Sequence, residues 1–378
     1  MHKKLKVLYI VTSLTSGGAE AMIYKLAKHM PKEDVDLSII TLRFGGFYEE
    51  KLLEYGIVVE DMGFKKNPFS ILPLYRLLNS VRRLKPDVIH TWLYHADFIG
   101  GIMVKLSQWN AKLIWSIRGE EVSLKANKLQ TYLFIRGCGL LSKVVPDSIV
   151  SNSSKGTESH IGIGYPRKKI AFIPNGFEVN RPTTPGLGIR EEVSLIAEGE
   201  FVIAHIGRLD YQKNQRDFVR VAEIISKLMS NVRFIMVGNG VTNDCEWLQQ
   251  LVVDCSLTSK LTLLGERRDI PDILSQVDIV VSTSLGEAFP NVVGEAIMAE
   301  VPCIVTDVGD CRKIVGDDSM CFDIGNVEGI ARRAVQILNM DKSEKVRFIK
   351  QISTGFKSKY SIENVAQQFI DCYREIVL

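Results

Sequence analysis

Residues 6–30, KVLYIVTSLTSGGAEAMIYKLAKHM, decide the fold. The apolar, β-branched run at 6–13 predicts a buried strand, and AEAMIYKLAKHM (19–30) has the spacing of an amphipathic helix. Gly17 and Gly18 lie between them and allow a tight turn. The stretch therefore predicts a strand–turn–helix unit, which is the repeating element of a parallel α/β sheet.

The same unit repeats along the chain. Residues 73–84 have helical spacing, and further strand-length apolar runs lie at 36–42, 87–91, 112–117 and 143–152. A break rich in Pro, Gly, Asn and Thr follows at 173–188 (IPNGFEVNRPTTPGLG). The alternation then restarts, with strands expected at 201–207, 232–238, 260–265, 278–284 and 302–307 and helices at 213–229 and 243–255. We expect two Rossmann-like domains with parallel sheets facing across a cleft, residues 1–178 and 179–360; the last helix, 361–378, could pack on either.

Composition is that of a folded soluble protein of about two domains, with 378 residues, 46% apolar and 24% charged. The seven cysteines include no CxxC pair, which disfavours a disulfide framework and a zinc site and indicates a reducing compartment. The start, MHKKLKVLYIVTSL, lacks the cleavage site of a signal peptide, so we expect a buried first strand. No run reaches the length of a membrane span, so any membrane contact is expected to be peripheral.

Charge is distributed unevenly along the chain. Residues 1–180 carry 25 Lys and Arg against 16 Asp and Glu, whereas residues 181–378 carry 22 against 28. This asymmetry reflects either chance and solubility or a basic half that faces an anionic surface or a phosphate-bearing ligand. No nucleic-acid partner is expected. The segment from Lys65–Phe69 through 82–85 mixes apolar and basic residues, which suits either an interfacial helix at a membrane or a helix with its apolar side in the core.

Two turns after expected strands have features of anion sites. In the first, Gly17 and Gly18 precede a helix N-terminus whose free N–H groups could bind an anion, although a packing turn is equally consistent. The turn is not GxGxxG, so a dinucleotide site and an NAD-dependent dehydrogenase are not indicated. In the second, GRLDYQKN (207–214), Arg208 and Lys213 lie near a helix start, an arrangement that suits the binding of a diphosphate. We favour this interpretation over the alternative that both are surface cations that lie near a turn by chance.

A third turn carries two carboxylates, in SLGEAFPNVVGEAIMAEVPCIVTDVG (284–309). Pro290 suits the first turn of a helix, which places Glu287 on the loop and Glu295 inside the helix. Glu287 could simply complement the helix dipole. Glu295 lies on an apolar helix side, where a carboxylate needs a partner, and a pair of ligand hydroxyls would serve.

These motifs together resemble the retaining glycosyltransferases of family 4, of the type that acts on bacterial surface polysaccharides. The resemblance rests on Glu287-x7-Glu295 with GRLDYQKN about 80 residues earlier, on IPNGFE and on LGERRDIPDILSQVDIVVSTS, and it covers about residues 5–330. It implies the GT-B fold, with the C-terminal helix returning to the first domain.

The resemblance also implies roles for single residues. Arg208 and Lys213 would hold the donor diphosphate, and Glu295 the ribose hydroxyls. Glu287 would hold the transferred sugar together with the backbone of the loop that follows it, Ala288, Phe289, Pro290, Asn291 and Val292. The region of Arg268 would lie against the nucleobase. The first domain, with Gly17 and Gly18, would bind the acceptor and close over the diphosphate.

Two positions depart from the family pattern. Ala288 replaces the usual glycine and adds a methyl group beside the sugar. Arg118 follows the strand at 112–117 where many members have a histidine, so Arg118 or His95 would take that contact. In HTWLYHAD (90–97), His90 is expected to be structural, whereas His95 is expected near the acceptor or leaving group, where an imidazole can exchange protons.

The implied activity is transfer of a hexose or N-acetylhexosamine from a nucleotide sugar, with a UDP-linked donor expected, in polysaccharide or lipopolysaccharide biosynthesis. The acceptor would be a saccharide or a polyprenyl-diphosphate-linked saccharide, and the enzyme would work in the cytoplasm, at the inner face of the membrane. Catalysis would fall to Glu287, Arg208, Lys213 and His95, without a metal and without a cofactor beyond the donor. The alternatives are a nucleotide-sugar 2-epimerase of the same architecture and a non-catalytic binding partner; the complete charged set of the site disfavours the latter.

Overall fold

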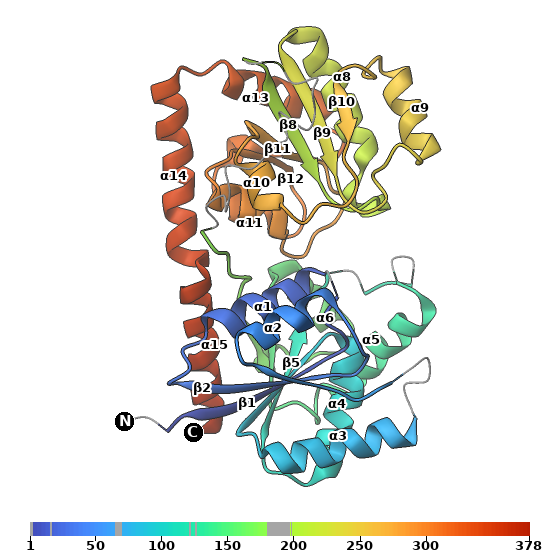
Figure 1. Ribbon diagram of the computed structural model, residues 1–378, viewed down its shortest axis with the longest axis vertical. Coiled ribbons are helices and arrows are strands. Elements are labelled where there is room, and N and C mark those ends of the chain that lie inside the picture. The colour runs from blue at the N-terminus through green and yellow to red at the C-terminus, as the bar shows by residue number, and fades with distance from the viewer. Residues whose placement is uncertain are drawn as a thin grey trace. The chain divides into compact units, whose positions relative to one another are not determined.

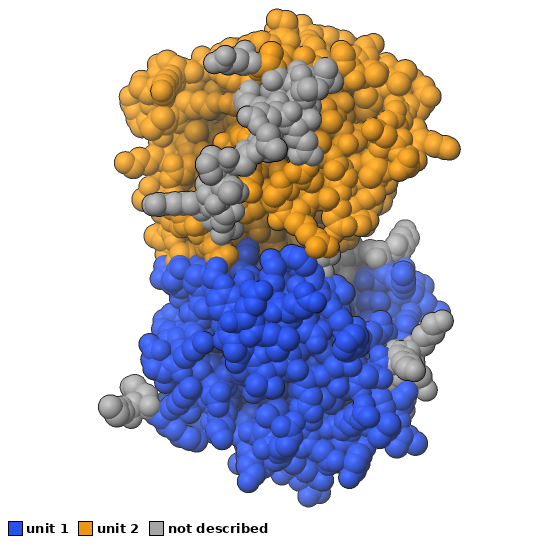
Figure 2. Space-filling view, viewed as in Figure 1, with its two compact units in different colours: residues 1–176, 362–378 blue, residues 177–361 orange. Residues whose placement is uncertain are grey.

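A computed structural model describes residues 3–15, 17–64, 70–120, 122–124, 127–179, 197 and 199–378. Lys65–Phe69 and residues 180–188 of the predicted break lie outside this part. The chain divides into two compact units, coloured separately in Figure 2: Met1–Gly176 with Ile362–Leu378, and Phe177–Ser361. The predicted boundary at 178 and the observed one at Gly176 differ by two residues.

Unit 1 is built on a seven-stranded sheet in the order β3-β2-β1-β4-β5-β6-β7, with every pair parallel. Its strands are β1 (Leu5–Val11), β2 (Val35–Thr41), β3 (Val58–Asp61), β4 (Val88–Trp92), β5 (Lys112–Ile117), β6 (Ser148–Ser151) and β7 (Ile170–Phe172). Along β1, Val7, Tyr9 and Val11 enter one core and Leu8 and Ile10 another. Both faces of the sheet are therefore covered, as its continuous apolar strands predict.

Two layers of helices cover these faces (Figure 1). Over the Tyr9 face lie α1 (Gly18–His29), α2 (Phe47–Glu54) and α15 (Ile362–Val377). Over the Leu8 face lie α3 (Ile71–Leu84), α4 (Tyr94–Ser107) and α5 (Leu129–Leu141), and α6 (Ser154–Gly162) follows β6. The C-terminal α15 belongs to this core, because the Tyr373 and Tyr9 hydroxyls lie 2.9 Å apart and both side chains are fully buried.

Unit 2 is built on a six-stranded parallel sheet in the order β10-β9-β8-β11-β12-β13. Its strands are β8 (Phe201–Ile206), β9 (Val232–Val237), β10 (Leu261–Leu263), β11 (Ile279–Ser282), β12 (Cys303–Thr306) and β13 (Cys321–Phe322). Its helices are α8 (Gln215–Leu228), α9 (Glu246–Asp254), α10 (Ile270–Leu274), α11 (Asn291–Met298), α12 (Cys311–Val315), α13 (Val327–Leu338) and α14 (Lys342–Tyr360). The two parallel α/β sheets agree with the predicted fold class.

The strand orders locate one special point in each sheet. The chain winds outward in one direction from β1 and from β8, then returns to place β4 beside β1 and β11 beside β8. The loops that leave the carboxyl ends of these neighbouring strands diverge, and doubly wound sheets bind their ligands at such switch points. In unit 2, these are the loops that carry Arg208 and Glu287.

Two local predictions are wrong. The predicted strand at 143–152 is reduced to Ser148–Ser151, because residues 142–145 form a turn that ends before Pro146. Pro290 is the N-cap of α11 and not its first residue. The first part of the predicted break is buried: Phe177 has no exposed surface, and its N–H donates to the Tyr360 carbonyl at 2.9 Å. Within the described residues, the structure contains no helix both long and apolar enough to span a membrane.

Candidate active site

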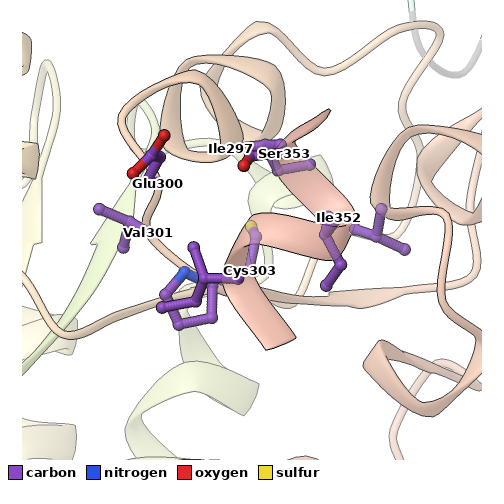
Figure 3. Close-up of a pocket in the computed structure, with 9 residues that line it drawn as sticks. Ile297, Glu300, Val301, Cys303, Ile352 and Ser353 are labelled. Atoms are coloured by element: carbon purple, nitrogen blue, oxygen red, sulfur yellow. The ribbon is translucent and has the colours of Figure 1, made fainter. Parts of the chain in front are cut away.

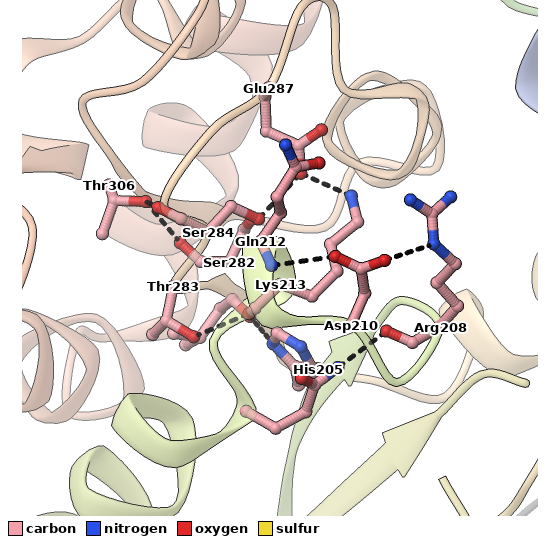
Figure 4. A network of polar contacts seen from close by, with 12 residues as sticks. His205, Arg208, Asp210, Gln212, Lys213, Ser282, Thr283, Ser284, Glu287 and Thr306 are labelled. Atoms are coloured by element: carbon pink, nitrogen blue, oxygen red, sulfur yellow. Dashed lines mark hydrogen bonds and ion pairs between the residues drawn. The ribbon is translucent and has the colours of Figure 1, made fainter. Parts of the chain in front are cut away.

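The loop after β8 fixes Arg208 at the switch point of unit 2 (Figure 4). The Gln215 side chain, which is 2% exposed, donates to the Arg208 carbonyl at 2.8 Å. The Asp210 carboxylate accepts from Arg208 Nε at 3.1 Å and from the Gln212 N–H at 2.9 Å. The guanidinium is thus oriented by Asp210 while 63% of its side chain stays exposed, so it can bind a further anion.

The loop after β11 is tied to the loop after β8 by backbone and hydroxyl contacts. The Leu285 N–H donates to the Gln212 carbonyl at 2.7 Å, and Thr283 Oγ1 donates to the Asn214 carbonyl at 2.9 Å. Thr306, at the end of β12, donates to the Ser284 carbonyl at 2.6 Å. These contacts hold the two loops in one register.

Lys213 and Glu287 meet between these loops (Figure 4). Lys213 Nζ lies 2.5 Å from Glu287 Oε1, and Ser284 Oγ donates to the same oxygen at 2.7 Å. The side chains are only 20% and 11% exposed, so the pair is shielded from water and electrostatically strong. Lys213 and Glu287 are 74 positions apart in the sequence and are in direct contact in the structure. From the sequence motifs, they were expected to bind different parts of the ligand, the diphosphate and the sugar.

His205 lies beneath this pair at the end of β8. Its ring is 1% exposed, and Nδ1 lies 3.1 Å from the Val281 carbonyl. Burial, together with the nearby Lys213 charge, lowers its pKa to about 4. His205 is therefore neutral at physiological pH and leaves Lys213 as the cation of this layer.

Gly309 supports the Glu287 loop from below, and sequence reasoning missed it. The residue has φ +56°, and a Cβ there would lie 1.6 Å from the Glu287 carbonyl oxygen and 2.9 Å from that of Ala288. Asp310 N–H also donates to the Ala288 carbonyl at 3.2 Å. Only glycine permits this approach, and the signal in the sequence was a glycine two residues after an expected strand.

The residues after Glu287 divide into anchors and backbone donors. Phe289 is 6% exposed and packs against Phe177 and Tyr360, with ring centroids 6.1 and 5.7 Å away. Its side chain is thus part of the core and is not available to a ligand. From Asn291, α11 begins with N–H groups that have no acceptor inside the helix, so the N–H groups of Asn291 and Val292, with that of Ala288 before them, can donate to a bound group. Pro290 caps the helix and has no N–H to offer.

Glu295 corrects one argument from the sequence. It is half-buried in α11, between the buried Gly294 and Ala296, as its apolar surroundings predicted. It has an interaction within the chain, so it is not without a partner in the absence of a ligand. The sequence pattern alone does not show this interaction.

Arg268 lies in the loop after β10, at the same sheet edge. Its side chain is exposed and has an interaction within the chain. The neighbouring Arg267 forms two hydrogen bonds to Asp269, at 2.8 and 2.5 Å. Since β9 separates β10 from β8, this loop lies roughly 10 Å from the Arg208 loop across the sheet edge.

In unit 1, the glycine turn after β1 has its own carboxylate. Gly17 caps α1, and a Cβ there would lie 2.2 Å from Glu20 Oε2. Glu20 is 8% exposed, accepts from Thr15 at 3.3 Å, and burial raises its pKa. Gly17 thus makes room for Glu20, and an anion bound beside Gly18 would have to share this helix N-terminus with it.

Arg118, after β5, lies flat on an aromatic surface. Its guanidinium carbon is 4.2 Å from the centroid of Trp92, and Nη1 donates to Asn175 Oδ1 at 3.0 Å. Nε and Nη2 are buried with no hydrogen-bond partner among the described atoms. Burial lowers the pKa to about 10, so the group remains a cation at neutral pH.

The two histidines of HTWLYHAD have different environments, and His90 is structural, as predicted. This residue is fully buried in β4, with Nδ1 2.8 Å from Tyr373 Oη and Nε2 2.6 Å from Ser116 Oγ. His95 is half-buried in the first turn of α4, 4.4 Å from the Phe134 ring, and burial lowers its pKa. Among the described residues no hydrogen bond joins His95 to Arg118. Asp97, which the sequence placed beside His95 beyond the strand, is buried and accepts from Thr91 at 2.5 Å.

Figure 3 shows a pocket in unit 2 that none of these loop residues lines. It is lined by apolar side chains and by Glu300 and Ser353, and it includes Cys303 at the amino end of β12. Its free volume of about 10 Å³ is room for about one water molecule. It is therefore no site for a sugar nucleotide. Within the described residues, no group of three or more His, Cys, Asp or Glu could hold a metal ion.

Comparisons with known proteins agree with this geometry. Residues 16–181 match the model of Glycosyltransferase Family 4, and residues 200–340 match that of Glycosyl transferases group 1. An Escherichia coli UDP-Gal:alpha-D-GlcNAc-diphosphoundecaprenol alpha-1,3-galactosyltransferase is 24% identical, over 98% of both chains. A Campylobacter jejuni alpha-1,4-N-acetyl-D-galactosaminyltransferase named for an undecaprenol-diphosphate-linked saccharide is 23% identical, over 98% of this chain and 99% of its own.

Solved structures share the fold. The Anabaena protein HepE, in complex with UDP and glucose, superposes with a TM-score of 0.82 at 20% identity, over 98% of this chain and 100% of its own. Two doubly wound α/β units are the architecture of the GT-B fold. The chain belongs to the glycosyltransferases, because the Glycosyltransferase Family 4 model and the Glycosyl transferases group 1 model together match most of its length.

Proposed function

We propose that this enzyme transfers a hexose or N-acetylhexosamine from a UDP-sugar to a saccharide carried on a polyprenyl diphosphate, with retention at the anomeric carbon and without a metal ion. It needs no cofactor besides the donor. The observation that carries the proposal is the shielded Lys213–Glu287 pair beside Arg208, on two tied loops at the switch point of unit 2.

The two cations suit the leaving group. As the bond from the anomeric carbon to the phosphate oxygen breaks, negative charge develops on the diphosphate. Arg208 presents exposed N–H groups, and Lys213 can donate to a phosphate oxygen while it still contacts Glu287. The acceptor hydroxyl bonds to the anomeric carbon from the same face, and its proton passes to the departing phosphate oxygen. No side chain needs to form a covalent intermediate.

Glu287 suits the sugar. Its carboxylate is fixed by Lys213 and Ser284, and the N–H groups that begin α11 lie at the end of the same loop. A carboxylate beside backbone donors can orient several hydroxyls of one ring, which is the requirement for holding a pyranose in position. The methyl group of Ala288 leaves less space for the sugar than a glycine would. Ala288 and its neighbours would therefore determine which hexose binds.

The rest of the donor lies along the sheet edge. The Arg268 loop is separated from the Arg208 loop by roughly 10 Å, a span that suits a nucleobase and ribose extending from the diphosphate. Glu295 would receive the ribose hydroxyls. The UDP of the HepE complexes and of the Escherichia coli relative's name supports a uracil nucleotide.

The acceptor proposal follows the relatives. The Escherichia coli and Campylobacter jejuni enzymes are named for diphosphoundecaprenol-linked saccharides and align along nearly the whole chain. An acceptor of this kind is anchored in a membrane, so we place the enzyme at the cytoplasmic face, in peripheral contact through unit 1. Gly17, Gly18, His95 and Arg118 belong to this unit and would serve the acceptor side.

The proposal is tested by donor binding and by transfer. UDP and UDP-sugars should raise the melting temperature more than GDP, ADP and their sugars do. With a polyprenyl-diphosphate-linked N-acetylglucosamine, the matching UDP-sugar should give a product with the donor's anomeric configuration, equally well in the presence of EDTA. An epimerised nucleotide sugar formed without acceptor would instead identify a 2-epimerase, and an inverted product or a requirement for a divalent cation would overturn that part of the proposal.

Glu295→Gln is expected to raise the KM for the UDP-sugar about tenfold and to change kcat little, because ribose contacts are the same in the ground and transition states. Steady-state kinetics and the Kd of UDP by calorimetry measure this. Glu328→Gln, on the exposed surface of α13, is the matched control. A lower melting temperature with an unchanged Kd of UDP would mean that Glu295 is structural only.

A further inference from the structure

Helix α5 of unit 1 exposes a row of large apolar side chains. Leu129, Leu133 and Leu140 are 62%, 60% and 79% exposed, and Val144, just beyond the helix, is 72% exposed. Their spacing with Arg136 follows the helical period, so the row forms one stripe along the outer side of α5. The opposite side of α5 is buried through Phe134, Ile135 and Cys138. The stripe is therefore not needed for the core.

The helices beside α5 have the same character. α4 packs against α5 and ends on the exposed Lys105 and Leu106, the latter 61% exposed. α3 packs against α4 and exposes Ile71, Leu72 and Tyr75 (84%, 60% and 60%) with Arg76. Single exposed apolar residues are ordinary on protein surfaces, but repeated ones on three neighbouring helices mark a contact surface.

The charge on these three helices indicates what kind of surface they contact. Helices α3, α4 and α5 together contain one acidic residue, Asp97, and it is buried. Eight basic residues on or beside them are exposed, and of these Arg83 pairs with Glu60. The other seven form no ion pair with a described residue: Arg76, Arg82, Lys85, Lys105, Lys128, Arg136 and Lys143. The other layer of the same unit, α1, α2 and α15, contains seven Asp and Glu in its helices: Glu20, Glu49, Glu50, Glu54, Glu363, Asp371 and Glu375. Of the two helix layers of unit 1, the one that exposes leucines is therefore the basic one.

We propose that the outer surface of α3, α4 and α5 docks on a bilayer that contains anionic lipids. The leucine stripe of α5 enters the boundary between headgroups and acyl chains, and the unpaired cations contact lipid phosphates. A surface that docks on a water-soluble protein would be expected to carry acidic side chains among these cations. A bilayer needs only apolar and cationic groups on one face, and no acid, which is what this layer presents. The inference rests on the membrane-bound acceptor proposed above and names the face that meets the membrane.

The stripe is tested with the full chain and vesicles. In sedimentation with phosphatidylcholine–phosphatidylglycerol vesicles the protein should pellet, and with pure phosphatidylcholine it should bind markedly less. The double variant Leu133→Gln, Leu140→Gln should reduce the partition coefficient at least tenfold. The matched control, Leu228→Gln with Val253→Gln, changes side chains of unit 2 that are 57% and 52% exposed, and it should bind as the parent does.

The charge contribution is tested by Arg136→Gln with Lys143→Gln. Each cation near an anionic surface contributes about 1 kcal/mol, so the pair should cost roughly 30-fold in binding at low salt, with a smaller difference at high salt. Transfer to a short-chain, detergent-dispersed acceptor should be unchanged in both double variants. This readout separates the two proposals, because loss of vesicle binding with intact transfer concerns only the docking face.

Two results would overturn the docking face. One is equal vesicle binding by the parent and both double variants. The other is self-association of the parent in solution, measured by light scattering, that the leucine variant abolishes, since the stripe would then be an interface between two copies. Absence of transfer together with stripe-dependent vesicle binding would instead overturn the proposed reaction and leave the surface in place.

Discussion

Replacing Lys213 by alanine should lower kcat for sugar transfer by about 10²–10³-fold, the loss typical of a donor that stabilises developing negative charge in a shielded site. Lys213 Nζ is 2.5 Å from Glu287 Oε1, and both side chains are mostly buried. Its removal takes away a cation at the leaving group and leaves the Glu287 carboxylate with Ser284 alone. Because the effect arises in the transition state, kcat should fall more than the KM of the donor rises.

The control for this variant is Lys227→Ala. Lys227 also makes an ion pair at 2.5 Å, with Glu223, but its side chain is 70% exposed on α8. Exposed pairs of this kind contribute little, so kcat and stability should stay close to those of the parent. The double variant Lys213→Ala, Glu287→Ala should be less impaired than the product of the two single effects, because the residues act as a unit. Equal kcat for Lys213→Ala and the parent would remove Lys213 from the mechanism.

The second large effect is expected for Gly309→Ala, which should lower both stability and activity. The added Cβ would take a left-handed conformation, at about 1–2 kcal/mol, and would lie 1.6 Å from the Glu287 carbonyl oxygen. The contact is with backbone, so the Glu287 loop must move, which adds roughly 1–3 kcal/mol. For a unit of this size, the melting temperature should fall by roughly 5–15 °C, and displacement of Glu287 should reduce transfer at least tenfold.

Gly316→Ala separates strain from displacement. Gly316 has φ +64°, close to the +56° of Gly309, but a Cβ there would have no neighbour within 4 Å. It should therefore lose the stability that backbone strain alone costs, about 1–2 kcal/mol, with unchanged transfer. If the two glycine variants showed the same activity, Gly309 would have no part in holding the Glu287 loop.

The sequence predicted the fold because its strands are long, apolar and evenly separated by helices. β4, β5 and β8 match their predicted bounds or lie within one residue of them at both ends, since both faces of each sheet are buried and the apolar runs are continuous. β6 was predicted too long, because the apolar residues Val144 and Val145 belong to a turn. The edge strands β3 and β7 were missed, because their residues are mostly half-exposed and the pattern is weak there.

By itself, the sequence determined which residue types stand at the strand-to-helix turns: the cations of GRLDYQKN, Glu287 and Glu295. These residues can be identified from short segments, because a charged residue that follows an apolar strand is recognised from the sequence of that segment alone. The tertiary structure decided which of them meet. It paired Lys213 with Glu287 and gave Glu295 a partner within the chain. It also placed Gly309 against the Glu287 backbone. These contacts depend on the order in which parallel strands lie side by side, and strand order arises from the packing of the whole sheet and is not encoded in any single segment.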